Sequence, residues 1–194
     1  MKIYEELKLL VQSDLYRYCG SLSIRAFIVC YLRYPGFKYT FLLRLCSFLA
    51  CRGSLIKTIS SPLFLLLRHY RYKFGFDIPI STKIGRGLFI SHFGSIIINP
   101  LAEIGENCNL SVGIVIGKQN RGKKMGVPVI KNHVFIGPGA KIIGNISIGN
   151  NSVIGSNSVV VDDVPNNAVV SGIPSDIISL KGSSGYINKV LELK

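Results

Sequence analysis

The sequence predicts a parallel β-helix preceded by a small α-helical domain, and two observations support this. From Asp77 onward, aliphatic residues recur at every sixth position through thirteen units, with two phase shifts. Before Asp77, apolar residues follow a helical spacing, and Pro35-Gly36 is the clearest break. Six-residue units, each one short strand and one corner, align their aliphatic residues into an interior ladder when they stack.

Residues 1–76 form the predicted helical domain, which is both apolar and basic. They carry a net charge of +9 out of +13 for the whole 194-residue chain. Their uncharged runs are shorter than the ~20 residues that a membrane-spanning helix needs. Two interpretations stay open, namely an ordinary buried helical domain, or helices that pack on a partner or lie at a membrane surface. Nucleic acid is not an expected partner, because no zinc finger, RNP motif or Lys/Arg block is present.

Residues 77–178 form the predicted β-helix, and residues 179–194 a C-terminal tail. The repeat positions are Ile78, Ile84, Ile90, Ile98, Ile104, Leu110, Ile116, Ile130, Ile136, Ile142, Ile148, Ile154 and Val160. Glycine often follows them, as expected where a tight corner disfavours β-branched residues. The repeat is the strongest signal in the chain.

The second phase shift extrudes a polar, glycine-rich loop at residues 117–128, "GKQNRGKKMGVP". Insertions at the corners of a solenoid commonly form binding faces. Arg121, Lys123 and Lys124 are therefore candidates for binding an anionic group. The alternative is a solvated basic loop.

His92 is the candidate general base. It follows the repeat residue Ile90 by two positions, so its side chain is expected at a corner, outside the aliphatic ladder. Asp77 lies 15 residues earlier, where consecutive coils can bring its carboxylate beside the imidazole. Such a pair fixes the tautomer and leaves the other ring nitrogen free to take a proton. The alternative is an exposed surface histidine, which is also the interpretation of His69 and His133.

Other chemistries find little support in the sequence. The five cysteines form no CxxC pair and the three histidines are scattered, so neither a disulfide framework nor a metal site is expected. The first 20 residues show no secretory signal, which favours a cytoplasmic location.

Several segments resemble the serine acetyltransferase branch of the hexapeptide acyltransferases. They are "DIPISTKIGRGLFISH" (77–92), "IGKQNRGKKMGVPVI", "IGPGAKIIGNISIGNNSVIGSNSVV" and "VPNNAVVSGIPSDII". The resemblance implies a left-handed β-helix, a homotrimer with active sites between subunits, and acetyl-CoA as the acetyl donor. It also implies that His92 is the general base and Asp77 its partner.

The resemblance further implies where the two substrates bind. The expected coenzyme A contacts are Gly117, Pro138, Ala140, Ser156, Ser158 and Pro174, reached partly through backbone groups. The expected acceptor contacts are Ser91, Asn99, Arg121, Lys123 and Lys124, of which the last three are also candidates for the coenzyme A phosphates.

The sequence departs from that branch at the expected acceptor site. Serine acetyltransferases carry an aspartate directly before the histidine, where this chain has Ser91, and an Arg-His pair where it has Gly126-Val127. The short, basic N-terminal part is instead similar to that of capsule, colanic acid and O-antigen acetyltransferases. We therefore expect acetyl transfer to a hydroxyl of a surface-polysaccharide sugar or its precursor, with a carbohydrate acceptor.

Two alternatives stay open. One is a serine O-acetyltransferase of cysteine biosynthesis, and the other is a non-catalytic trimeric scaffold. The expected location is cytoplasmic, with peripheral contact to the inner face of the plasma membrane through residues 1–76.

Overall fold

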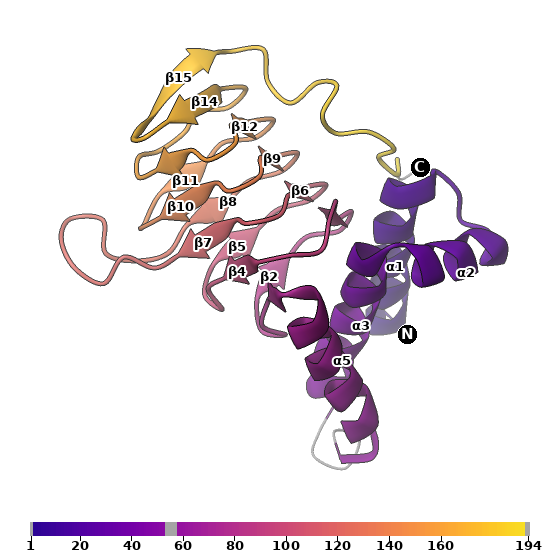
Figure 1. The fold of residues 1–194 in the computed structure, drawn as a ribbon. Helices are drawn as coiled ribbons and strands as arrows, with labels where there is room; N and C mark the ends of the chain where they lie inside the picture. Colours follow the sequence, from indigo (N-terminus) through magenta and orange to yellow (C-terminus); the bar gives the residue numbers. More distant parts are fainter. Residues whose placement is uncertain (1, 53–57, 193–194) are drawn as a thin grey trace.

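The computed structural model describes residues 2–52 and 58–192, and it places a group of helices at one end of a three-sided β-helix (Figure 1). The helices are α1 (Lys2–Cys19), α2 (Ile24–Arg33), α3 (Pro35–Ala50) and α5 (Ser61–Phe74). Gly75 ends α5 in the left-handed conformation, with φ +71°, and the first strand begins at Phe76. No helix in the described ranges is long and apolar enough to cross a membrane.

Three sheets form the walls of the β-helix, and successive strands visit them in turn. Sheet A contains β1 (Phe76–Asp77), β4 (Ile96–Ile98), β7 (Val115–Gly117), β10 (Lys141–Ile143) and β13 (Val159–Val160). Sheet B contains β2 (Lys83–Ile84), β5 (Glu103–Ile104), β8 (Val129–Ile130) and β11 (Ser147–Ile148). Sheet C contains β3 (Phe89–Ile90), β6 (Asn109–Leu110), β9 (Phe135–Ile136), β12 (Val153–Ile154), β14 (Val169–Gly172) and β15 (Ser175–Ser179).

All neighbouring strands are parallel except β15, which runs antiparallel to β14. The structure thus confirms a parallel β-helix preceded by helices. The repeat residues form its interior, and those in the middle coils are completely buried: Leu110, Ile116, Ile136, Ile142, Ile148 and Ile154. Ile84 is only half-buried, because it lies in the first coil at the end that faces the helices.

Buried polar contacts fasten the helices to the first coil. The Arg44 side chain in α3 pairs with Asp14 in α1 and also donates to the backbone carbonyl of Ile84 at 2.6 Å. The Tyr18 hydroxyl accepts from the backbone N–H of Ile90 at 3.0 Å. Because these contacts are shielded from water, they fix how the helices sit on the β-helix.

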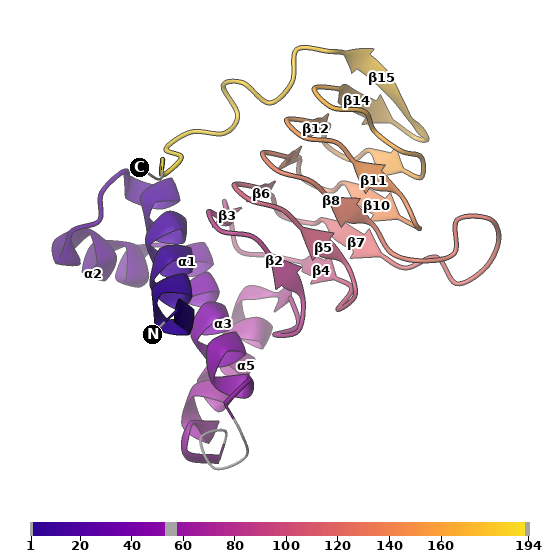
Figure 2. The same ribbon diagram turned by 180° about the vertical axis from the view of Figure 1, so that it is seen from behind.

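The C-terminal segment after β15 runs back along sheet C to α1, as Figure 2 shows from behind. The ring of Tyr186 lies 4.7 Å from that of Phe135, and Lys189 Nζ donates to the carbonyl of Tyr18 at 3.0 Å. The described part of the predicted tail is therefore a strap over the outer face of sheet C.

Candidate active site

The turns that lead from sheet C to sheet A stack along one edge of the β-helix, which we call the C–A edge. They comprise residues 91–95, 111–114, 137–140 and 155–158. Backbone hydrogen bonds join each turn to the next, from Gly113 N to Ser95 O, from Gly139 N to Val112 O and from Asn157 N to Pro138 O. The edge is therefore a continuous ladder of turns, with an almost fixed geometry from coil to coil.

His92 lies at the end of the C–A edge nearest the helices. It belongs to the turn between β3 and β4, and its side chain is exposed. The turn is held on both sides, because Ser91 N donates to Leu110 O at 3.2 Å and Gly94 N donates to Phe74 O at 2.8 Å. The backbone around the imidazole is thus fixed, while the ring is open to a ligand.

The structure places Asp77 on the strand next to the His92 turn, but pairs it with a different side chain. Asp77 lies opposite Ile97 in the register of β1 and β4, and its carboxylate forms an ion pair with Arg71 near the end of α5. Both partners of this pair are about half exposed. The Asp77–His92 pair stays a prediction.

The predicted coenzyme A contacts divide into three groups. Pro138 and Ser156 are exposed on the C–A edge, and Pro174 is exposed just beyond β14 on sheet C. Ala140 and Ser158 belong to the same turns but are 0% exposed, with their side chains in the interior of the coil. These two residues can therefore contact a ligand only through their backbone groups.

The third group lies at a different edge. Gly117 ends β7 and opens the loop at residues 118–128, on the edge where the chain passes from sheet A to sheet B. This A–B edge also holds Asn99, whose side chain accepts from Leu101 N at 3.0 Å and closes a turn. Arg121 and Lys123 are exposed in the loop. Lys124 instead donates to Val161 O at 2.8 Å and pairs with Asp162.

The two predicted groups of acceptor contacts are thus separated within one chain. His92 and Ser91 lie on the C–A edge, whereas Asn99 and the basic loop lie on the A–B edge. The width of sheet A stands between the edges, and a three-residue strand alone spans about 10 Å. One chain does not bring these groups together.

Lys141 lies beside the C–A edge but is not among the site residues predicted from the sequence. Its side chain stands on the outer face of sheet A, in register with Val115 and Val159, and its Nζ donates to Gly113 O on the C–A edge. The signal in the sequence is a lysine in an outward position whose neighbours in adjacent coils are aliphatic.

His133 differs from its expected surface position. It is half-buried with φ +57°, and its Nε2 lies 3.2 Å from Asn107 Nδ2. Burial lowers its pKa. His69 is exposed on α5.

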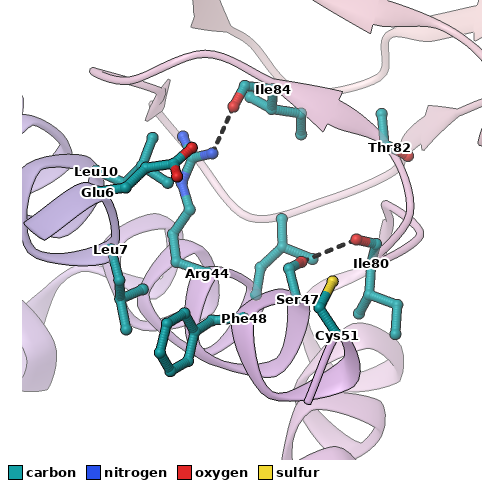
Figure 3. Close-up of a pocket in the computed structure, with 11 residues that line it drawn as sticks. Glu6, Leu7, Leu10, Arg44, Ser47, Phe48, Cys51, Ile80, Thr82 and Ile84 are labelled. Atoms are coloured by element: carbon teal, nitrogen blue, oxygen red, sulfur yellow. Dashed lines mark hydrogen bonds between the residues drawn. The ribbon is translucent and has the colours of Figure 1, made fainter. Parts of the chain in front are cut away.

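A cavity of about 270 Å³ lies between the helices and the first coil (Figure 3). Leucine and isoleucine side chains from α1, α3 and the first coil line it, together with Ser47, Cys51 and Thr82. None of the predicted site residues belongs to its lining. The exposed C–A edge, and not this cavity, is the candidate active site.

Comparisons with known proteins agree with the repeat. Residues 128–162 match the family described as bacterial transferase hexapeptide (six repeats). A serine acetyltransferase of Synechococcus elongatus is 35% identical over 152 residues, which are 78% of this chain and 60% of that protein. A serine acetyltransferase of Staphylococcus aureus is 38% identical over 112 residues, 58% of this chain and 53% of that protein. The chain thus spans little more than half the length of these relatives.

Solved structures give a similar result. A serine acetyltransferase from Brucella abortus superposes with a TM-score of 0.75 at 28% identity, covering 94% of this chain and 72% of that one. The same protein in complex with coenzyme A gives a TM-score of 0.70 at 30% identity, covering 90% of this chain and 67% of that one.

These comparisons correct the sequence analysis on the acceptor. The expectation of a carbohydrate acceptor from surface-polysaccharide synthesis is wrong, since the relatives and the solved structures are named serine acetyltransferases. Ser91 and Gly126-Val127 led to that expectation, but the similarity extends across most of the chain and includes the helices. The chain belongs to the hexapeptide-repeat acyltransferase family.

Proposed function

We propose that this chain is an acetyl-CoA-dependent serine O-acetyltransferase. The observation that carries the proposal is the exposed His92 at the foot of a continuous ladder of turns, in a chain similar to serine acetyltransferases over 78% of its length. The acceptor follows from these relatives.

In the proposed reaction, an imidazole nitrogen of His92 takes the proton from the hydroxyl of serine. The oxygen attacks the thioester carbonyl, and the C–S bond breaks as the tetrahedral intermediate collapses. The imidazolium then returns its proton to the departing thiolate, so His92 ends each turnover neutral. Backbone N–H groups of the turns are candidates for stabilising the oxyanion.

The donor is proposed to lie along the C–A edge. Pro138 and Ser156 present exposed side chains there, and Ala140 and Ser158 contribute backbone groups. An extended pantetheine arm can follow such a ladder because its amides match the repeating polar groups of the turns. The solved relative with coenzyme A supports this class of ligand.

We also propose that the β-helix is left-handed and that the chain forms a homotrimer with sites between subunits. The outer face of sheet C is covered by the strap and the outer face of sheet B carries the Lys83–Glu103 ion pair, whereas sheet A presents Ile97, 43% exposed, and Val115. Packing sheet A against a neighbour buries these aliphatic side chains. It also brings the A–B edge loop of one subunit toward the C–A edge of another, which a single chain cannot do.

The test is an assay of coenzyme A release from acetyl-CoA with serine and with sugar acceptors. We expect turnover with serine and a fall in kcat of roughly 10²–10⁴-fold for His92→Asn, the usual contribution of a general base. His69→Asn is the matched control, since it removes an exposed histidine from α5. Serine turnover that survives in His92→Asn would exclude His92 as the base, and no turnover with serine in the wild type would refute the proposed acceptor.

A further inference from the structure

A stripe of aliphatic residues runs along the exposed side of α2. Ile24, Ile28 and Leu32 recur every four residues and therefore lie on one side of the helix. They are 81%, 52% and 70% exposed, and Val29 beside them is 46% exposed. The outer side of a helix on a water-soluble protein is normally polar. An aliphatic stripe of this kind indicates a surface that meets something other than water.

The opposite side of α2 is firmly packed, so the helix cannot rotate to bury this stripe. The ring of Phe27 lies 5.6 Å from that of Phe37 and 5.1 Å from that of Phe41, both in α3. Cys30 is 1% exposed. Ser23 caps the helix by accepting from Ala26 N at 3.1 Å. The aliphatic side is thus held outward by the fold itself.

Two arginines lie beside the aliphatic stripe of α2. Arg25 and Arg33 are exposed on the same half of α2. Between Asp14 and Asp77 the sequence contains ten lysines and arginines and no acidic residue; of the ten, Arg17 and Arg44 are buried and Arg71 pairs with Asp77. A surface of this kind is complementary to an anionic partner. A second copy of α2 is a poor occupant, because a two-fold contact would bring the arginines of both copies into one apolar interface.

We propose that α2 binds in the headgroup region of an anionic phospholipid bilayer. In this arrangement Ile24, Ile28 and Leu32 enter the acyl boundary, and Arg25 and Arg33 reach the phosphates through their long side chains. The ten-residue helix lies in the membrane plane. Both views place α2 at the outer edge of the helical part, away from the β-helix, so a bilayer there leaves the C–A edge accessible (Figures 1 and 2).

The experiment measures co-sedimentation of the purified full chain with vesicles of phosphatidylcholine, with and without phosphatidylglycerol, at low and high salt. We expect binding only to the anionic vesicles, weakened by salt because the phosphate contacts are screened. Arg25→Gln/Arg33→Gln should lower the partition coefficient by roughly 25-fold, since each lipid-facing cation contributes about fivefold. Ile24→Ser/Leu32→Ser should lower it by at least about tenfold.

Matched controls remove the same groups from the other end of the molecule. Ile178→Ser/Leu180→Ser replaces aliphatic side chains that are 66% and 68% exposed near β15. Lys131→Gln/Lys181→Gln removes one exposed cation from the β-helix and one from the strap. Both controls should bind vesicles like the wild type, and thermal unfolding should be unchanged in every variant.

Three outcomes overturn the proposal. They are no binding of the wild type to anionic vesicles, equal loss of binding in the controls and the α2 variants, and a lower oligomeric mass of Ile24→Ser/Leu32→Ser by light scattering. The last outcome would assign the stripe to a second copy of the chain. None of these measurements depends on acetyl transfer.

Discussion

Replacing Arg44 with methionine should weaken the attachment of the helices to the β-helix. Arg44 Nε lies 3.0 Å from Asp14 Oδ2, and the guanidinium also donates to the carbonyls of Ile84 and Gly85, each at 2.6 Å. Asp14 is 0% exposed and also accepts from Leu88 N at 2.8 Å. In Arg44→Met the carboxylate therefore loses its cation while it stays buried.

Removal of one partner from a buried pair costs about 3–5 kcal/mol, because the remaining charge is neither solvated nor compensated. We expect this loss in the free energy of unfolding of Arg44→Met near neutral pH. Burial already raises the pKa of Asp14, and Arg44 opposes that effect. In the variant the folded-state pKa rises further, so the loss should shrink as the pH falls and the folded protein takes up a proton before the unfolded chain does.

The assay is urea unfolding followed by circular dichroism at two pH values, with hydrogen exchange of α1 and α3. The double variant Asp14→Leu/Arg44→Met is the control, because it removes both charges and fills the site with apolar atoms. It should be more stable than Arg44→Met alone. A loss below about 1 kcal/mol in Arg44→Met, or a double variant no more stable than that single one, would show that the pair does not hold the helices in place.

Three further predictions concern the edges of the β-helix. In Gly139→Ala, the new Cβ would lie 2.0 Å from Asn157 Oδ1, at a residue whose φ is +74°. We therefore expect a raised KM for acetyl-CoA and a lower melting temperature. The control for backbone strain alone is Gly185→Ala, because Gly185 has φ +85° and no heavy atom within 4 Å of the new Cβ. In His133→Asn, the destabilisation that develops below about pH 6.5 should diminish, because the unfolded state protonates before the half-buried imidazole of the folded protein does. Urea midpoints near pH 7 and pH 5 measure this, and an unchanged dependence of stability on pH would contradict it. In Ser91→Asp, a carboxylate beside the candidate base should attract the ammonium group of serine and lower the KM for serine by about fivefold, with kcat little changed. An unaltered KM for serine would place the ammonium group elsewhere.

The six-residue repeat was sufficient to predict the β-helix, because each interior position is set by one local rule. A residue such as Leu110 or Ile142 faces the interior whenever its coil closes, and the same residue type recurs at the next coil. The predicted corners follow from the same rule, although one residue of each turn, such as Ala140 or Ser158, also faces the interior. The turns of the C–A edge could thus be placed from spacing alone.

Contacts between distant segments could not be predicted in this way. The Asp14–Arg44 pair joins residues 30 positions apart on two helices, and neither carries a local signal that distinguishes it from a solvated charge. Tyr186 packs on Phe135 although the surrounding sequence is polar. Asp77 was placed beside His92 from coil spacing, but the helix that precedes it supplies Arg71, which a repeat pattern cannot reveal. Each of these contacts depends on how separate elements dock.

The separation of the candidate site over two edges favours the proposed homotrimer. His92 and the exposed turns are built on the C–A edge, where stacking fixes them, while the loop at residues 118–128 projects from the A–B edge. Lys124 joins the loop to the next coil, because its Nζ donates to Val161 O and pairs with Asp162, just past β13. In the proposed homotrimer, this loop would approach the His92 of a neighbouring subunit. The outer face of sheet A, which presents Ile97 and Val115 beside Lys141, provides the surface on which such a neighbour is proposed to pack.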